Sequence, residues 1–498
     1  MILGQLCSET MRLEYITKMV QPVTVKGPQS CEIEGLAYDS RQVRPGYLFV
    51  ALHGHRQEGA DFIADALKRG AVAVVADSDR WTGRNVTTIV VKDTRQALAE
   101  IACAFYEEPS SRLQMIGITG TNGKTTTSFM ARDILNAAGR PAGLIGTIRY
   151  EIGQRSIPAA RTTPEAPDIQ AMLDRMLKAG CRSAVMEVSS HGLDQKRVWG
   201  IDYDVGVFTN LTQDHLDYHE TMEKYFAAKT QLFRGLGQME KRAHAVINMD
   251  DPWGMQLANT NGFSARLITF GLHPTAMVMA EDVQLAPDHS TFRLVTPWGS
   301  TPVRLKLPGG FNVSNALAAA AATAVLGVEI PVIAQALEKT DPVPGRLERI
   351  PTDRGFQVFV DYAHTPDALE NVLTTLRSLT RGRLIVVFGC GGSRDRGKRP
   401  LMGGAAAQLA DHTVLTSDNP RNEDPAAIIA EIEAGMTGNA SYDTEVDREK
   451  AIFRALSMAK AGDLVVVAGK GHENCQEFAD TVVPFDDREV VRRLLMNL

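Results

Sequence analysis

The sequence predicts an α/β protein of three domains, with a doubly wound, Rossmann-like sheet in the C-terminal domain. The chain has 498 residues, which suggests about three domains of ~100–200 residues each. Short apolar runs typical of buried strands alternate with helical patterns, and this alternation predicts parallel sheets with helices on their faces. A glycine-rich turn also separates one buried strand from the helix that follows it, which predicts a P-loop in the central domain.

The bulk composition excludes several classes of protein. The chain is 44% hydrophobic and 22% charged, as in globular proteins, and its net charge of −6 argues against non-specific nucleic-acid binding. Its six cysteines form no C-x-x-C pair, which favours reduced thiols over a disulfide framework or a zinc site. The N-terminus lacks a signal-like apolar core, and the longest apolar stretch, residues 316–326, is too short to span a bilayer. We therefore expect a cytoplasmic protein without a membrane partner.

Residues 1–112 are predicted to form a small α/β domain. Two polar stretches stand out in it, at residues 38–41 and 53–59, and each taken alone is typical of a solvated loop. The segment at residues 107–111 is a plausible junction to the next domain. Strands are expected at residues 47–52, 71–76 and 88–91, and helices at 60–68 and 94–106.

The glycine-rich turn occupies residues 117–127, with the sequence G-I-T-G-T-N-G-K-T-T-T, and a helical pattern follows over 124–138. In such a turn, backbone N–H groups and the helix N-terminus bind phosphate. Lys124 can neutralise the β- and γ-oxygens, and Thr125 can ligate Mg²⁺. A strict Walker A loop has glycine where this chain has Ile118. The Lys-Thr pair at the helix start nevertheless favours a nucleoside triphosphate site over an ordinary turn.

The central domain is expected over residues 113–343, and polar residues follow two of its buried strands. The run at 184–191 predicts a strand with a polar C-terminal end, where Glu187 could reach the metal of the triphosphate. Alternatively, Glu187 is a capping or salt-bridged residue. A second strand, at 204–209, leads into the polar, histidine-rich residues 210–219, which are predicted to line a site.

Lys229 lies in a helix predicted over residues 222–233 and shares a face with Phe226 and Phe233. A lysine on an apolar face is usually a surface residue whose ammonium group extends to solvent. If it is buried instead, its charged form is disfavoured, and the neutral amine can take up CO₂.

The C-terminal domain is expected over residues 344–498. Strands are predicted at residues 358–362, 384–388, 413–416 and 464–468, and helices at 368–378, 402–409, 426–434 and 449–459. Three polar, glycine-rich segments follow strands and should converge on one sheet edge: residues 389–399, 417–423 and 469–473. Their arginines could bind a carboxylate, and Asp418 and Glu473 an ammonium group, so they suit a zwitterionic amino acid.

These motifs together resemble the Mur ligases of peptidoglycan synthesis, over essentially the whole chain. The resemblance is carried by T-G-T-N-G-K-T-T, E-V-S-S-H, H-L-D-Y-H, D-Y-A-H-T-P and G-K-G-H-E, at residues 119–126, 187–191, 215–219, 361–366 and 469–473. It implies an ATP-dependent ligase of cell-wall synthesis that releases ADP and phosphate. The implied reaction adds meso-diaminopimelate to the D-glutamate of UDP-N-acetylmuramoyl-L-alanyl-D-glutamate, and a monomer is expected.

The resemblance also implies roles for individual residues. ATP would be bound by Gly120, Thr121, Asn122, Gly123, Lys124, Thr125, Thr126, Asn312 and Arg346, although Asn312 or Asn315 could instead cap the Ala-rich helix. Mg²⁺ would be held by Thr125, Glu187, His215 and Lys229, the last carried as a carbamate, and Lys124, Lys229 and His215 would be catalytic. The UDP-sugar peptide would meet Tyr38, Ser40, His55, Thr162, Thr163, Ser189, Gln195 and Arg197. Diaminopimelate would meet Arg394, Asp418, Asn419, Pro420, Arg421, Gly469 and Glu473.

Arg421 is expected to select the amino acid, because family members that add diaminopimelate resemble this chain in having Arg there. Diaminopimelate has a second carboxylate that lysine lacks, and an arginine can bind it bidentately. Two positions depart from the family pattern: Ser393 replaces the usual Asp, and Arg161 stands where Asn is common.

Three other functions remain open from the sequence. The first two are a lysine-adding Mur ligase and a folylpolyglutamate-synthetase-type ligase. The folylpolyglutamate-synthetase type should lack the N-terminal domain, and its amino-acid loop should suit glutamate. The third is a P-loop regulatory switch that binds a partner protein, but it would not explain the polar strand ends of the third domain.

Overall fold

The computed structural model describes residues 10–53, 58–78 and 86–498. The chain divides into two compact units. The first unit contains Met1–Gly117, Arg140–Val205 and Gln231–Ala243, and the second contains Ile118–Gly139, Gly206–Thr230 and His244–Leu498. Strand β8 (Gln114–Thr119) begins in the first unit and ends in the second. The boundaries expected at residues 112 and 343 stay a prediction.

The N-terminal part of the first unit is an α/β layer built on a five-stranded sheet. The strand order is β2-β7-β6-β5-β4, in which only β2 is antiparallel to its neighbour. These strands are β2 (Thr24–Lys26), β4 (Gly35–Ala37), β5 (Tyr47–Val50), β6 (Ala73–Ala76) and β7 (Thr87–Val90). The helices are α1 (Leu13–Met19), α2 (Ile63–Lys68) and α3 (Thr94–Phe105), and β1 (Met11–Arg12) pairs with β3 (Glu32–Ile33). The three strands predicted for this region are confirmed, with ends that differ by one or two residues.

The rest of the first unit carries a second set of strands in the order β11-β10-β9-β12, in which β9 and β12 are parallel. They are β9 (Ala142–Ile145), β10 (Arg149–Ile152), β11 (Arg155–Pro158) and β12 (Ser183–Glu187), with helices α4 (Pro109–Arg112), α6 (Ala166–Lys178) and α7 (Ser190–Asp194). The predicted strand at 184–191 is too long. It ends at Glu187, because the Ser189 hydroxyl accepts the N–H of Gly192 at 3.1 Å and caps α7.

The second unit begins with helix α5 (Lys124–Ala137), strand β13 (Val205–Phe208) except its first residue, helix α8 (Leu216–His219) and the part of helix α9 (Met222–Gly235) up to Thr230. Next come β14 (His244–Asn248), α10 (Pro252–Ala258) and β15 (Arg266–Gly271), and then β16 (Val278–Leu285), β17 (Ser290–Thr296) and β18 (Gly299–Leu305). Strands β14, β15 and β16 are parallel, whereas β16, β17 and β18 form an antiparallel meander that is not predicted from the sequence. The alanine-rich helix α11 (Gly310–Ala324) is buried as expected, and α12 (Ile330–Lys339) follows it.

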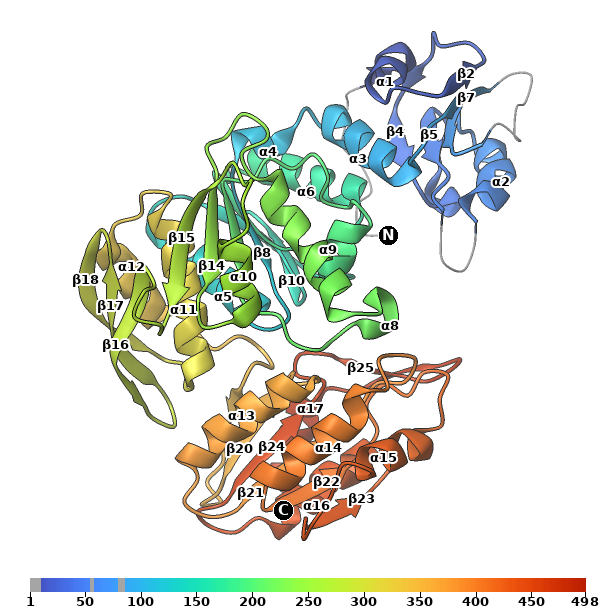
Figure 1. Cartoon of the computed structure of the whole chain (residues 1–498). Coiled ribbons are helices and arrows are strands. Elements are labelled where there is room, and N and C mark those ends of the chain that lie inside the picture. Colours follow the sequence, from blue (N-terminus) through green and yellow to red (C-terminus); the bar gives the residue numbers. More distant parts are fainter. Residues whose placement is uncertain (1–9, 54–57, 79–85) are drawn as a thin grey trace. The chain divides into compact units, whose positions relative to one another are not determined.

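The C-terminal part of the second unit is the doubly wound sheet that the sequence predicts. Its order is β19-β20-β24-β21-β22-β23, and all neighbouring strands are parallel except the pair β19 and β20. The strands are β19 (Glu348–Ile350), β20 (Gln357–Asp361), β21 (Leu384–Phe388), β22 (His412–Leu415), β23 (Tyr442–Thr444) and β24 (Leu464–Ala468). Figure 1 shows helices on both faces of this sheet. One core contains α13 (Pro366–Leu379), α14 (Lys398–Leu409) and α15 (Pro425–Glu433), and the other contains α16 (Arg448–Met458) and α17 (Asp487–Asn497). A small hairpin, β25 (Cys475–Glu477) and β26 (Val482–Pro484), follows β24.

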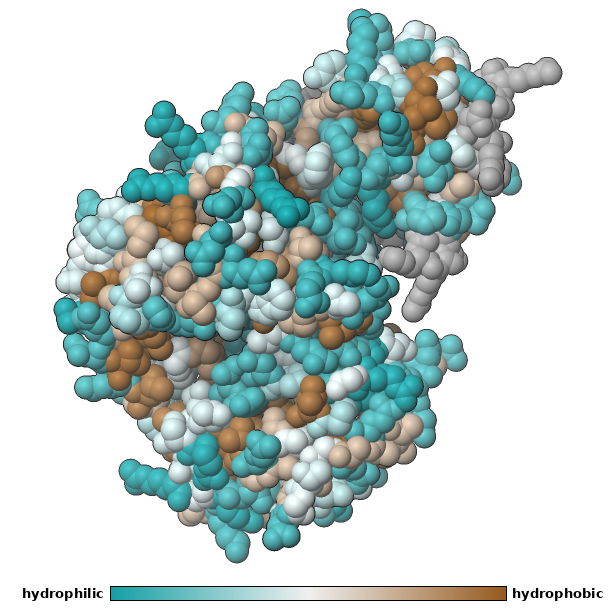
Figure 2. Space-filling view, viewed as in Figure 1, coloured by the Kyte–Doolittle hydropathy of each residue, from teal (hydrophilic) through white to brown (hydrophobic). Residues whose placement is uncertain are grey.

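Exposed apolar side chains of the second unit include several on and beside the β16–β18 meander, where Figure 2 shows brown atoms. They include Leu272, Met277, Leu285 and Trp298, of which Trp298 is 47% exposed. Single exposed apolar residues are normal on soluble surfaces. Within the described ranges, the structure has no helix long and apolar enough to cross a membrane.

Candidate nucleotide and amino-acid sites

The P-loop requires glycine at two positions. Gly120 has a φ of +146° and Gly123 a φ of +86°, values that L-amino acids with side chains rarely adopt. A Cβ atom on Gly120 would lie 1.9 Å from the hydroxyl oxygen of Thr209. A Cβ atom on Gly123 would lie 2.3 Å from the side-chain oxygen of Asn315. The sequence spacing of these glycines is therefore imposed by both backbone conformation and close packing.

Lys124 and Thr125 begin α5 directly after this loop. The Lys124 ammonium donates hydrogen bonds to the carbonyl oxygens of Gly120, at 3.0 Å, and Thr121, at 2.8 Å. Thr125 is 4% exposed, and its hydroxyl accepts a hydrogen bond from a terminal guanidinium nitrogen of Arg346 at 3.1 Å. The structure thus places Arg346 beside the P-loop although 221 residues separate it from Thr125.

The P-loop is also tied to the start of α13. The Asn122 amide nitrogen donates to the carboxylate of Asp367 at 2.8 Å, and the Asn122 backbone N–H donates to the Asn210 side chain at 2.8 Å. Burial raises the pKa of Asp367. Asp367 is not among the residues predicted from the sequence, although it directly follows the motif D-Y-A-H-T-P.

Lys229 is buried, at 1% exposure, in helix α9. Its Nζ donates to the carbonyl oxygen of Gly120 at 2.8 Å and lies 4.5 Å from the centre of the Tyr225 ring. Burial, and then the neighbouring charge of Lys124, hold the pKa of Lys229 well below its usual range. The alternative of a solvent-reaching lysine is therefore wrong, because the amine lies inside the unit against the P-loop.

Three side chains, two imidazoles and one lysine amine, lie around the carboxylate of Asp214. His215 lies with Nε2 3.4 Å from the Asp214 carboxylate, His364 with Nε2 at 3.6 Å and Lys398 with Nζ at 3.7 Å. Burial alone would raise the pKa of Asp214, but the hydrogen bond from His364 and the charges of these neighbours hold it well below its usual range. The carboxylate is therefore ionised and fixes His215, whose φ of +56° is left-handed.

Asn312 and Asn315 do not cap the alanine-rich helix, so that alternative is wrong. The N-cap of α11 is Gly309, and Asn312 lies within the helix, donating its amide to the carbonyl of Pro308 at 2.8 Å. The Asn315 amide donates to the Asn312 side chain at 3.3 Å. The Asn315 oxygen accepts the Thr127 hydroxyl at 3.4 Å, which connects the helix with the P-loop.

The three polar loops of the C-terminal sheet do converge; we call residues 389–397, 417–423 and 469–473 the amino-acid loops. Buried Lys470 lies at their centre, with Nζ 2.9 Å from both the Asn419 oxygen and a Glu473 carboxylate oxygen. Its Nζ is also 3.6 Å from the carboxylate of Asp418. The Asn419 amide nitrogen donates to Glu473 at 2.9 Å. Only Lys470 of this group is missing from the predicted site residues, although it belongs to the motif G-K-G-H-E.

Arg421 lies between two of these loops. Its backbone is left-handed, with a φ of +52°, and its guanidinium donates to the carbonyl of Gly392 at 3.0 Å and pairs with Glu477 at 2.7 Å. Arg394 lies close by, and both arginines lie next to Gly391. A Cβ atom added to that glycine would be 3.0 Å from a guanidinium nitrogen of Arg421 and 3.8 Å from Cγ of Arg394. Arg394 is exposed, and its guanidinium donates to the carbonyl of Ser393. Two arginines are thus available at one edge of the sheet.

A fully buried ion pair holds the strand ends from which two amino-acid loops start. Arg448 donates to both carboxylate oxygens of Asp487, at 2.8 and 2.7 Å, and neither side chain is exposed. The same guanidinium donates to the carbonyls of Ser417, at 3.2 Å, and Ala468, at 2.9 Å. The sequence carries no signal for this role, because no periodic pattern links the four residues.

In the first unit, five residues predicted to meet the UDP-sugar peptide form one cluster. The Thr163 hydroxyl donates to the Glu187 carbonyl at 2.9 Å and accepts the N–H of Ser189 at 2.9 Å. Arg197 donates to the Thr163 carbonyl at 2.9 Å and to the Gln195 side chain at 2.6 Å. The Thr162 hydroxyl is 3.0 Å from that of Thr147.

Other predicted residues of the first unit lie apart from that cluster or outside the described residues. The Tyr38 hydroxyl donates to Asp168 of α6 at 2.6 Å, and burial raises the pKa of Tyr38. Ser40 is 4% exposed in a short 3-10 helix, Ser40–Gln42. His55 lies outside the described residues. Arg161, at the departure from the family pattern, pairs with Glu165 at 2.8 Å.

Glu187 is fully buried at the end of β12, and its carboxylate accepts the Thr147 N–H at 2.9 Å and the Thr147 hydroxyl at 2.8 Å. These bonds support the local structural role that the sequence left open. Within the described ranges, no group of three or more His, Cys, Asp or Glu side chains could hold a metal ion. Metal binding by Thr125, Glu187, His215 and Lys229 therefore stays a prediction.

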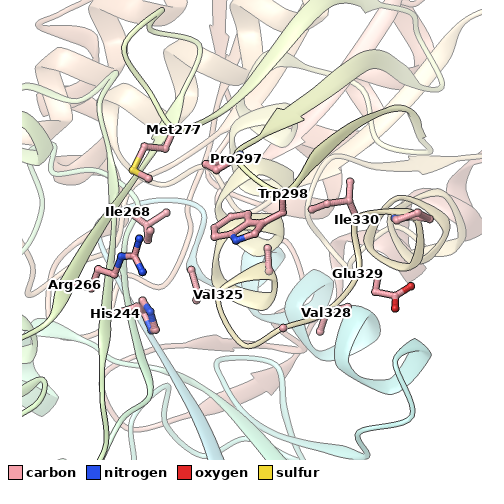
Figure 3. Close-up of a pocket in the computed structure, with 13 residues that line it drawn as sticks. His244, Arg266, Ile268, Met277, Pro297, Trp298, Val325, Val328, Glu329 and Ile330 are labelled. Atoms are coloured by element: carbon pink, nitrogen blue, oxygen red, sulfur yellow. The ribbon is translucent and has the colours of Figure 1, made fainter.

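A separate cavity of about 600 Å³ lies at the opposite end of α11 from the P-loop contacts. Figure 3 shows Arg266 and His244 facing Trp298 and Val325 across it. No residue predicted for nucleotide or amino-acid binding lines this cavity. The candidate site is therefore the P-loop with the amino-acid loops.

Three family models match successive parts of the chain. They are the Mur ligase family catalytic domain at residues 32–106, the Mur ligase middle domain at 118–323, and the Mur ligase glutamate ligase domain at 345–471. Together with the relatives described next, these matches show that the chain belongs to the Mur ligase family. It is an ATP-dependent ligase that forms an amide bond.

Particular relatives are similar over nearly the whole chain. A UDP-N-acetylmuramoyl-L-alanyl-D-glutamate--2,6-diaminopimelate ligase of Geobacillus thermodenitrificans is 47% identical, with 97% of this chain and 99% of that protein covered. A ligase of the same name from Geobacter metallireducens is 46% identical, with 98% and 99% covered. A solved structure of a ligase of that name has a TM-score of 0.69 and 36% identity, with 98% of this chain and 99% of that chain covered.

Proposed function

We propose that this chain adds meso-diaminopimelate to the D-glutamate γ-carboxylate of UDP-N-acetylmuramoyl-L-alanyl-D-glutamate, with ATP as the energy source, in peptidoglycan biosynthesis. The observation that carries the proposal is the similarity at 46–47% identity, over almost the full length, to ligases named for this reaction. We further propose that it acts in the cytoplasm as a monomer, without a nucleic-acid or membrane partner.

The amino-acid loops support the choice of substrate. Asp418 and Glu473 offer carboxylates to an ammonium group, and Arg394 and Arg421 offer guanidinium groups to carboxylates. Diaminopimelate carries two such zwitterionic ends, whereas lysine lacks the second carboxylate. We assign recognition of that second carboxylate to Arg421.

The proposed reaction has two steps. An oxygen of the D-glutamate γ-carboxylate attacks the γ-phosphorus of ATP, and ADP leaves, so an acyl phosphate forms. The amino nitrogen of diaminopimelate then attacks the acyl carbon, loses a proton, and releases phosphate. Lys124 stabilises the charge that develops on the phosphate oxygens, and the P-loop N–H groups orient them. No protein nucleophile is required, so the residues act by positioning and by charge.

Mg²⁺ and a modified lysine belong to the same proposal. The hydroxyl of Thr125, at the N-terminus of α5, suits a cation that prefers oxygen ligands and shares phosphate oxygens. His215 and Glu187 are the other proposed ligands, and bound Mg²⁺ would neutralise charge on the transferred phosphoryl group. Lys229 fits a carbamate, because its amine is buried and its pKa is lowered, so the neutral amine can add to CO₂ with loss of a proton.

One assay tests the proposed function. ADP release is measured with the UDP-linked dipeptide and with meso-diaminopimelate, lysine or glutamate in turn. We expect release that depends on meso-diaminopimelate. Release with lysine or glutamate alone would assign the chain to one of the other ligase types. Nucleotide binding without release in any arm would support a regulatory switch.

A further inference from the structure

One buried arginine connects two of the amino-acid loops. Arg399 lies in the first turn of α14, and its side chain has no exposed surface. Its two terminal nitrogens donate parallel hydrogen bonds, each 2.9 Å long, to the two carboxylate oxygens of Glu423. It also donates to Glu431 of α15 at 2.8 Å and to the carbonyl of Gly391 at 3.2 Å. Arg399 therefore holds residues of both the 389–397 and the 417–423 loops from a helix that packs in the core.

Glu423 transmits this constraint to the backbone of the neighbouring loop. One of its carboxylate oxygens accepts the backbone N–H of Ser393. The backbone N–H of Glu423 donates to the carbonyl of Pro420 at 3.0 Å, and the N–H of Gly392 donates to the carbonyl of Asn419 at 2.9 Å. Both carboxylate oxygens of Glu423 are therefore engaged within the protein.

Two residues in these loops hold an unusual backbone conformation. Ser393 has a φ of +54° and Arg421 a φ of +52°, both in the left-handed region. Residues with side chains persist there only where the surrounding structure holds them. Ser393 directly precedes Arg394, so the hydrogen bond from the Ser393 N–H to Glu423 fixes the Gly392–Ser393 peptide, one residue before the backbone from which that arginine projects.

We propose that the Arg399–Glu423 pair is a positioning device that sets the directions of Arg394 and Arg421 and thereby the selectivity for the amino-acid substrate. The inference rests on the proposed function. Neither member needs to touch the substrate, because Arg399 is fully buried and Glu423 is engaged by Arg399 and Ser393. The planar guanidinium matters as much as its charge, since only arginine can bond both carboxylate oxygens in this geometry.

The decisive variant is Glu423→Gln, which keeps the shape of a side chain that is 25% exposed but removes its charge. Glu449→Gln is the matched control, because Glu449 lies outside the amino-acid loops, in α16, and its carboxylate pairs with the exposed Arg493. For Glu423→Gln we expect the KM for meso-diaminopimelate to rise roughly tenfold, with the KM for ATP within about twofold of the wild type. The preference for diaminopimelate over lysine in kcat/KM should fall by a similar factor, and Glu449→Gln should retain the wild-type values.

A second measurement needs no substrate. Amide hydrogen exchange in the peptide spanning residues 390–396 should be faster in Glu423→Gln than in the wild type or in Glu449→Gln. Arg399→Gln should show the same changes, and if it does not fold, Glu423→Gln decides alone. Wild-type exchange and wild-type KM in Glu423→Gln would overturn the inference, as would equal losses for ATP and diaminopimelate. A wild-type chain without diaminopimelate-dependent ADP release would instead overturn the proposed function.

Discussion

The amine of Lys229 donates a hydrogen bond to the carbonyl oxygen of Gly120 at 2.8 Å, across 109 residues of sequence. This bond places a buried amine against the phosphate-binding loop, and Lys124 bonds the same carbonyl at 3.0 Å. Two like charges that share one acceptor disfavour each other, which is why the pKa of Lys229 is lowered by Lys124 in addition to burial. The geometry favours a neutral Lys229 beside a charged Lys124.

Replacing Lys229 by alanine should abolish most of the ligase activity. We expect a loss of roughly 100-fold or more in kcat, the size associated with removal of one preorganised charge-stabilising group. If the lysine acts as a carbamate, added formate or acetate should restore part of the activity, because a free carboxylate can occupy the same place. Lys224→Ala is the control, since Lys224 lies on the same helix but is exposed and pairs with Glu220. A Lys229→Ala variant that short carboxylates do not rescue would count against the carbamate.

Gly123→Ala should damage nucleotide binding rather than overall folding. The added Cβ would lie 2.3 Å from Asn315 in a left-handed position, so the loop must move. We expect the KM for ATP to rise at least about tenfold, which corresponds to ~1.4 kcal/mol. Gly139→Ala is the matched control at the other end of α5, because Gly139 also has a positive φ, of +71°, but a Cβ there meets no atom within 4 Å. Equal effects of the two substitutions on the KM for ATP would contradict this view of the loop.

The sequence predicts the C-terminal fold well because its strands are short, continuous and apolar. The strands at residues 384–388 and 464–468 match β21 and β24 without any shift. Since parallel strands expose their polar loops at one edge, the convergence of Asp418, Asn419 and Glu473 follows from topology alone. In a parallel sheet, it is enough to know that a loop follows the end of a strand to place its side chains at that edge of the sheet.

The β16–β18 meander could not be predicted in the same way. Residues 282–285 at the end of β16 are exposed, and Pro302 interrupts the apolar pattern of β18. Strand β16 therefore carries neither a continuous apolar run nor strict alternation, and β18 alternates only after Pro302. The register of β16 with β17 also shifts between Glu281 and Gln284, an irregularity that a period of two does not predict.

The ion-pair partners of buried charged side chains could not be predicted from the sequence either. Arg448 and Asp487 are 39 residues apart, and Arg399 and Glu423 are 24 apart. No periodicity relates such pairs, because they meet only when separate elements of the sheet pack. The candidate site could thus be predicted for the residues within motifs, and not for the residues that hold those motifs in place.

His472 should make stability depend on pH. Burial lowers the pKa of His472 to about 3, and its Nδ1 has no hydrogen-bond partner among the described residues. An unfolded histidine titrates near 6.5, so between these values the unfolded chain binds a proton that the folded chain does not. The contribution of His472 to the free energy of unfolding is therefore fully present above pH 6.5 and is lost as the pH falls toward 3. Between pH 8 and pH 5 we expect a loss of about 2 kcal/mol in the free energy of unfolding.

Denaturant titrations at pH 8 and pH 5 measure this effect. His472→Gln should reduce the difference between the two pH values by about 2 kcal/mol relative to the wild type. His273→Gln, which changes an exposed histidine, is the control. The same pH difference in the wild type and in His472→Gln would show that this imidazole does not carry the effect.

Arg421→Lys should weaken the binding of diaminopimelate more than the binding of any other substrate. Lysine keeps the positive charge, but it cannot bond a carboxylate bidentately or reproduce the contacts of Arg421 with Gly392 and Glu477. Hydrogen bonds between charged groups contribute ~1.5–3 kcal/mol, so the KM for meso-diaminopimelate should rise about 10- to 100-fold while that for ATP stays unchanged. Initial rates of ADP release at varied diaminopimelate and lysine measure both the KM and the preference. Arg454→Lys, an exposed arginine of α16, is the control. If Arg421→Lys retained the wild-type preference for diaminopimelate over lysine, the second carboxylate would have to be read by another residue, and Arg394 would be the next to test.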